Sequence, residues 1–147
     1  MKLPTTPSFR LDDKRALIIG SSSGIGVGCA VALADAGASV VLAARRIDLL
    51  DDLKKSLLKK GYKAEAIKLD VTKINEVVDT INNHDSFDIM VNSSGLARHS
   101  PTVETTEKDF NNVIDVNLKG AYFITKEVAK KLIKENILKI SIFIEKS

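Results

Sequence analysis

Residues 18–26, Ile-Ile-Gly-Ser-Ser-Ser-Gly-Ile-Gly, have the composition of a turn that holds phosphate. An apolar run at residues 16–19 ends at Gly20, and Gly24 and Gly26 open an amphipathic segment. Glycine permits a tight turn and close backbone approach, while the free N–H groups and dipole of a helix start favour negative charge. The spacing G-x-x-x-G-x-G differs from the commoner G-x-G-x-x-G, so a strand-to-helix turn without a ligand is the alternative. We assign to this phosphate cradle Gly20, Ser21, Ser22, Ser23, Gly24, Ile25 and Gly26.

Two arginines, Arg45 and Arg46, follow the apolar run at residues 38–44. In a dinucleotide-binding fold, the end of the second strand contacts the adenosine ribose. A carboxylate there would accept from the 2′-hydroxyl and repel a 2′-phosphate, whereas a guanidinium binds phosphate through two parallel hydrogen bonds. The two arginines therefore favour NADP(H) over NAD(H). The alternative is a pair of solvated arginines at the end of a strand.

The elements that must position these residues are apolar runs that alternate with amphipathic segments. Thr72 is placed to cap the helix that follows it, and residues 106–109, Thr-Glu-Lys-Asp, resemble a capping box. Asn117 and Gly120 interrupt the apolar pattern of the last long helix. We expect strands at residues 15–20, 38–44, 63–69, 87–91 and 137–144, and helices at 24–36, 47–60, 73–84 and about 106–136.

This order of elements predicts an α/β fold in which helices wrap a parallel sheet. Right-handed crossovers place the first strand near the centre and give the strand order 3-2-1-4-5. We therefore expect a Rossmann-like, doubly wound sheet of about five strands. Residues 1–147 would form one domain, with residues 1–10 as an extended lead-in.

Composition excludes several other classes of function. The net charge of +3 is too small to indicate nucleic-acid binding, and no apolar run is long enough to predict a membrane span. Residues 1–10 lack the apolar stretch of a signal peptide, and Cys29 is the only cysteine, so no internal disulfide can form. A reducing, cytoplasmic location is expected. We assign no metal ligands.

Several motifs, in their order along the chain, resemble those of the short-chain dehydrogenase/reductase family. The similarity runs from about residue 11 to residue 136. Residues 11–15 and 116–126 also resemble bacterial members, including enzymes like 3-oxoacyl-acyl-carrier-protein reductase and gluconate 5-dehydrogenase. The resemblance implies an NADP-dependent oxidoreductase that reduces a carbonyl or oxidises an alcohol of a small molecule. The motifs are Gly20-x-x-x-Gly24-Ile25-Gly26, Asp70-Val71, Asn92-x-x-Gly95 and Asn117.

The resemblance also implies roles for individual residues. The glycines of the cradle would hold the pyrophosphate, and Arg45 would hold the 2′-phosphate. Asp70 would accept a hydrogen bond from the adenine amino group, with the backbone of Val71 beside it. Asn92 and Gly95 would line the cofactor cleft.

The helix that contains Asn117 carries two further implications of the resemblance. Asn117 would support a water relay behind the active site. The family uses this helix for core and dimer packing, so a homo-oligomer through it is expected, with half of the usual interface missing.

In this family a tyrosine protonates the carbonyl oxygen, a lysine four residues later lowers the tyrosine pKa, and a serine polarises the carbonyl. That Tyr-x-x-x-Lys would fall beyond residue 147, so we expect a truncated fold that lacks both residues. Ser147 aligns with the family's serine. Tyr122 and Lys126 have the same spacing but follow Asn117 too closely, and we interpret Tyr122 as a packing residue.

The sequence departs from the family pattern at two further places. Ile19 stands where the family has threonine, and Ser93-Ser94 stand where it has Asn-Ala. We expect an oxidoreductase by family whose isolated chain is inactive or strongly impaired. The alternatives are a non-catalytic module that binds a nucleotide or a partner, and a truncated remnant.

Overall fold

The computed structural model describes residues 8–135 and 142–143 of the 147-residue chain. Five parallel strands form one sheet in the order β3-β2-β1-β4-β5, as the sequence predicts. Of the last predicted strand, the described part is the pair of residues that continues the sheet beside β4. The strands are β1 (Arg15–Ile19), β2 (Ser39–Ala44), β3 (Ala64–Lys68), β4 (Ile89–Asn92) and β5 (Ile142–Phe143).

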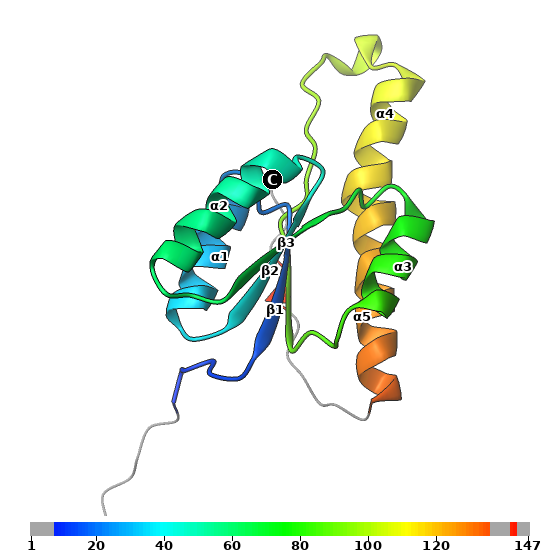
Figure 1. Cartoon of the computed structure of the whole chain (residues 1–147). Helices are drawn as coiled ribbons and strands as arrows, with labels where there is room; N and C mark the ends of the chain where they lie inside the picture. The colour runs from blue at the N-terminus through cyan, green and yellow to red at the C-terminus, as the bar shows by residue number, and fades with distance from the viewer. Residues whose placement is uncertain (1–7, 136–141, 144–147) are drawn as a thin grey trace, which may run out of the picture.

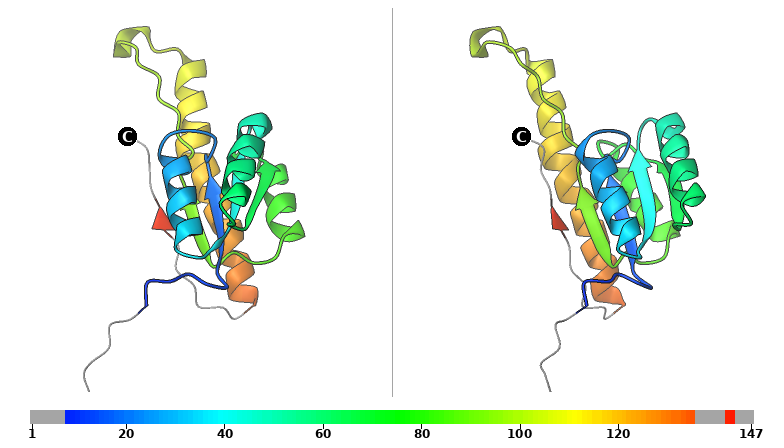
Figure 2. Two further views of the ribbon diagram at one scale, coloured as in Figure 1. Left: turned by 60° about the vertical axis from the view of Figure 1, so that its left-hand side comes forward. Right: turned by 90° about the vertical axis from the view of Figure 1, so that its left-hand side faces the viewer.

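Helices cover both faces of this sheet. In Figure 1, α1 and α2 lie on one side and α3 and α5 on the other, which is the doubly wound arrangement. A helix and loop segment that includes α4 extends past the end of the sheet (Figure 2). The helices are α1 (Ile25–Asp35), α2 (Ile47–Lys59), α3 (Ile74–Asn83), α4 (Glu107–Ile114) and α5 (Ala121–Lys134), with a short 3-10 turn, η1, at Thr102–Glu104.

Two apolar cores lie on the opposite faces of the sheet. Successive residues of a strand point to opposite faces, so Ala16 and Ile18 of β1 pack toward α1 and α2 while Leu17 and Ile19 pack toward α3 and α5. Because helices cover both faces, the central strands are apolar without interruption. This is why the sequence shows them as continuous apolar runs.

The predicted long helix at residues 106–136 is divided into three segments. Between α4 and α5, residues Asp115–Gly120 form a π-helix, η2, at the place where Asn117 and Gly120 interrupt the apolar pattern. A Cβ on Gly120 would lie 2.9 Å from the side chain and the carbonyl oxygen of Val71, so this turn lies directly against the chain after β3. Single π-helical turns often occur at functional sites.

The two predicted helix caps have different outcomes. Thr106 caps α4: its Oγ1 accepts a hydrogen bond from the backbone N–H of Asp109 at 3.1 Å, which confirms that prediction. The prediction for Thr72 is wrong, because α3 begins after Lys73 without a side-chain cap. Thr72 instead donates through its backbone N–H and its hydroxyl to Asp70 Oδ1, at 3.1 and 2.8 Å. Its hydroxyl therefore fixes the turn after β3.

In the part of the chain that the structure describes, no helix has the length and apolar character needed to cross a lipid bilayer.

Candidate nucleotide-binding cleft

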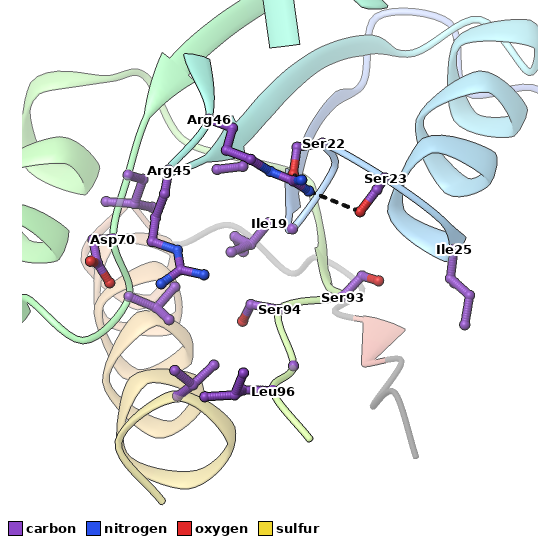
Figure 3. A pocket seen from close by; sticks show the side chains of 16 residues that line it. Ile19, Ser22, Ser23, Ile25, Arg45, Arg46, Asp70, Ser93, Ser94 and Leu96 are labelled. Carbon is purple, nitrogen blue, oxygen red and sulfur yellow. Dashed lines mark hydrogen bonds between the residues drawn. The ribbon is translucent and has the colours of Figure 1, made fainter. Parts of the chain in front are cut away.

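A cleft lies at the carboxyl ends of β1, β2 and β4, where parallel sheets of this kind hold ligands (Figure 3). It brings together most of the residues assigned from sequence. From the phosphate cradle and the second strand, these are Gly20, Ser22, Ser23, Ile25, Arg45 and Arg46; from later segments, they are Asp70, Val71 and Gly95. Seven lining residues were not assigned from sequence: Ile19, Ala44, Leu69, Ser93, Ser94, Leu96 and Val116.

The glycine turn is shaped by contacts between backbones. Gly20 and Gly24 have φ angles of 79° and 60°, in the region that favours glycine. A Cβ on Gly20 would lie 2.5 Å from the carbonyl group of Ser93, and a Cβ on Gly26 would lie 2.4 Å from the carbonyl oxygen of Gly20. Gly20 thus allows the turn to touch the segment after β4, and Gly26 allows α1 to start against the turn.

The three serines of the turn have different surroundings. Ser22 and Ser23 line the cleft. Ser21 is fully buried and is not among the lining residues. Its hydroxyl has no hydrogen-bond partner within the described structure. The structure therefore places two of the three predicted serines at the site.

The two arginines at the end of β2 point in different directions. The side chain of Arg45 projects into the cleft beside Asp70 (Figure 3). The guanidinium of Arg46 lies across the glycine turn, where Nη2 donates to the hydroxyls of Ser22 and Ser23 at 3.0 and 3.1 Å (Figure 3). The β2 end of the cleft therefore carries two guanidinium groups, that of Arg46 bound to the turn before α1 and that of Arg45 beside Asp70, and two positive charges favour an anionic ligand.

The segment after β4 is held by hydrogen bonds with two asparagine side chains, Asn92 and Asn117. Asn92, which is buried, accepts through Oδ1 from the backbone N–H of Ser94 at 3.1 Å and from its hydroxyl at 2.5 Å. Asn117 accepts from the N–H of Leu96 at 2.8 Å and donates to its carbonyl at 2.9 Å. Neither asparagine lines the cleft. Both side chains position the backbone that does.

A second, more apolar hollow lies beside this segment, on the α5 side. Its lining includes Asn92, Ser94, Asn117, Tyr122 and Lys126. Tyr122 does not pack in the core of this chain, because 63% of its surface is exposed; packing of Tyr122 between two copies of the chain stays a prediction. Lys126 Nζ lies 3.2 Å from the carboxylate of the next residue in α5.

Two further predictions from the sequence concern Ser147 and metal ligands. Ser147 lies outside the described residues. Over residues 8–135 and 142–143, no group of three or more histidine, cysteine, aspartate or glutamate side chains gathers where a metal ion could be held.

Comparison with known proteins shows the family of this chain. A sequence model for short chain dehydrogenases matches residues 14–141. Gluconate 5-dehydrogenase of Gluconobacter oxydans is 33% identical over 129 residues, covering 85% of this chain and 50% of that protein. The 3-oxoacyl-acyl-carrier-protein reductase of Thermotoga maritima is 35% identical over 131 residues, covering 86% of this chain and 53% of that protein. The chain thus spans about half the length of the curated relatives it matches.

Solved structures show the same fold. A gluconate 5-dehydrogenase from Burkholderia cenocepacia, crystallised in complex with NADP and tartrate, superposes with a TM-score of 0.84 at 31% sequence identity. The superposition covers 94% of this chain and 55% of that one.

Proposed function

This chain belongs to the short chain dehydrogenase family. We propose that it binds NADP(H) as the cofactor-binding part of an oxidoreductase that reduces a carbonyl or oxidises an alcohol. One observation carries the proposal: the glycine turn and the two β2 arginines meet in a single cleft at the carboxyl ends of parallel strands. Such a cleft fits a dinucleotide, because the turn and the start of α1 suit a pyrophosphate and guanidinium groups suit a further phosphate.

Different residues of the cleft would bind different parts of the cofactor. The backbone of the glycine turn and the hydroxyls of Ser22 and Ser23 would bind the pyrophosphate. Arg45 would bind the 2′-phosphate, with Arg46 beside it. Asp70 would accept from the adenine amino group, and its position is fixed by the two hydrogen bonds it receives from Thr72. When bound, the cofactor supplies or accepts a hydride.

The preference for NADP(H) is tested at Arg45. We expect the chain to bind NADPH more tightly than NADH, and Arg45→Ala to weaken NADPH binding by about 1–3 kcal/mol through loss of a charge-assisted pair. Titration by fluorescence or calorimetry measures both affinities. Arg98→Ala is the matched control, since Arg98 is an exposed arginine that pairs with Asp109 outside the cleft. Equal affinity of the parent for the two cofactors would contradict the preference.

We further propose that chain 1–147 on its own binds cofactor without reducing carbonyl compounds. A catalytic acid must come within about 2.6–3.2 Å of the oxygen that it protonates. Tyr122 lines the second hollow instead of the cleft, and Lys126 is paired with the neighbouring Glu127. These observations favour a nucleotide-binding module over a complete enzyme.

NADPH oxidation with a panel of ketones and β-keto esters tests this second proposal. We expect no turnover by the parent or by Tyr122→Phe, although both proteins bind NADPH. Turnover that disappears in Tyr122→Phe would make Tyr122 the acid and contradict the proposal.

The partner that we propose is a second copy of this chain, through the helix that contains Asn117. Four large apolar side chains along α4, η2 and α5 are 58–75% exposed, and a second copy would cover them. Sedimentation of the parent and of Leu118→Glu tests this; we expect an oligomer that the glutamate dissociates, and a monomeric parent would contradict it. The four side chains are Phe110, Leu118, Tyr122 and Ile133.

A further inference from the structure

We propose that the hydroxyl oxygen of Ser94 accepts a hydrogen bond from a hydroxyl of the second ribose of the dinucleotide, the ribose remote from adenine. This assignment rests on the proposed binding of NADP(H) in the cleft. Ser94 stands where the family pattern has alanine, so the motif itself assigns no hydroxyl to this position.

The hydrogen-bond pattern fixes Ser94 as an acceptor toward the cleft. The backbone N–H of Ser94 donates to Asn92 Oδ1 at 3.1 Å, so that atom must be the oxygen of the amide. The Ser94 hydroxyl lies 2.5 Å from the same oxygen and must therefore donate its proton to it. With its proton committed to Asn92, the Ser94 hydroxyl can offer a ligand only the lone pairs of its oxygen.

Ser94 also faces the ligand. It lines the cleft, and its hydroxyl and the guanidinium of Arg45 project toward the middle of the cleft from opposite sides (Figure 3). The guanidinium end suits phosphate, whereas an oxygen that can only accept repels phosphate oxygens and attracts a hydroxyl donor. The two sides of the cleft are therefore chemically different.

The position of Ser94 along the cleft selects the second ribose. A dinucleotide with its adenosine at the end of β2 and its pyrophosphate on the glycine turn places its second nucleoside on the β4 side. Gly20 of the turn touches the backbone of Ser93, since a Cβ on Gly20 would lie 2.5 Å from it. The residue next in sequence thus lies beside the pyrophosphate site. The group that follows the pyrophosphate covalently is the ribose, and the base lies beyond it.

Binding measured by calorimetry for three kinds of ligand tests the assignment. Adenosine 2′,5′-bisphosphate lacks the second ribose, NADP⁺ contains it, and NADP⁺ analogues deoxygenated at the 2′ or 3′ position of that ribose lack the hydroxyl. The proteins are the parent, Ser94→Ala, and Ser56→Ala as a matched control, because the Ser56 hydroxyl donates to a carbonyl within α2, outside the cleft.

We expect Ser94→Ala to bind NADP⁺ about 3- to 10-fold more weakly than the parent, the loss typical of one neutral hydrogen bond, and to bind adenosine 2′,5′-bisphosphate equally well. One of the two deoxy analogues should bind the parent as weakly as NADP⁺ binds Ser94→Ala. That analogue should lose nothing further in the variant, because both changes remove the same hydrogen bond. Ser56→Ala should behave as the parent.

Three results would overturn the assignment. Unchanged NADP⁺ affinity in Ser94→Ala would show that the hydroxyl makes no contact. The loss of affinity from Ser94→Ala could add fully to the loss from removing the ribose hydroxyl, for both deoxy analogues. That result would show that Ser94 acts through its turn or through another part of the cofactor. Failure of the parent to bind adenosine 2′,5′-bisphosphate and NADP⁺ would overturn the proposed function itself, and the assignment with it.

Discussion

Gly26 and Gly28 lie two residues apart in α1, and alanine at the two positions should have opposite effects. A Cβ on Gly28 would meet nothing within 4 Å, whereas a Cβ on Gly26 would lie 2.4 Å from the carbonyl oxygen of Gly20. Gly28→Ala therefore changes only the intrinsic helix preference. Gly26→Ala forces the start of α1 away from the glycine turn.

The magnitudes follow from these distances. Alanine is more favourable than glycine inside a helix by about 0.5–1 kcal/mol, so Gly28→Ala should raise the free energy of unfolding by that amount. At Gly26 the same gain is offset by overpacking, which costs about 1–3 kcal/mol. The contact falls about 1 Å short of ordinary van der Waals distance, which begins at 3.4 Å, and the atoms concerned are backbone. A net loss of about 1–2 kcal/mol is expected.

Thermal unfolding and NADPH titration measure the two consequences. For a chain of this size, about 1 kcal/mol shifts Tm by roughly 2–4 °C. Gly28→Ala should raise Tm slightly and leave NADPH binding unchanged. Gly26→Ala should lower Tm and weaken NADPH binding by about 10-fold or more, because the displaced turn loses at least one hydrogen bond to a charged group.

Two results would refute this reasoning. Equal shifts of Tm for Gly26→Ala and Gly28→Ala would mean that the turn yields to the methyl group without cost. Loss of stability in Gly26→Ala with unchanged NADPH affinity would mean that the turn is not the phosphate site.

Three further changes test individual contacts, two that stabilise the fold and one that positions the backbone of the cleft. Lys131 donates to carbonyls at the end of α3, at 2.9 Å for Ile81, so Lys131→Met should cost about 2 kcal/mol in a denaturant titration. Asn117→Ala should speed hydrogen exchange at the amide of Leu96 and weaken NADPH binding, since both polar backbone groups of Leu96 lose their partner. A hydrogen bond to a carboxylate of α1 raises the pKa of Tyr62. The stability that this hydrogen bond contributes is therefore present below pH about 10 and lost as pH rises through the folded pKa. In Tyr62→Phe, the free energy of unfolding should therefore fall less steeply with pH above about 10 than in the parent.

The sheet order and the boundaries of most elements could be predicted because both faces of the sheet are covered. Strands buried on two faces appear as unbroken apolar runs, and glycines such as Gly37 and Gly61, with φ angles of 108° and 83°, end the helices between them. Right-handed connections leave few alternative orders. Local pattern and chain topology therefore determine this part of the structure together.

Other features depend on contacts between distant segments, which a local pattern does not contain. The π-helix at Asp115–Gly120 exists where Asn117 reaches the backbone of Leu96 and where Gly120 lies against Val71. The sequence shows only that the apolar pattern stops there. The exposed position of Tyr122 likewise depends on which surfaces of α5 the rest of the chain covers.

The motif residues separate into two groups with different tolerance for change. Ser22, Ser23 and Arg45 face the cleft, so substitutions there should alter binding and leave the fold intact. Gly26 and Asn117 contact other parts of the backbone, so substitutions there should alter the fold first and binding as a consequence. A sequence motif does not distinguish these groups, because it records which residue stands at a position and not what that residue contacts. The position of Ser94 illustrates the difference: the family pattern assigns its side chain no polar role, whereas its place in the cleft and its committed proton give it one.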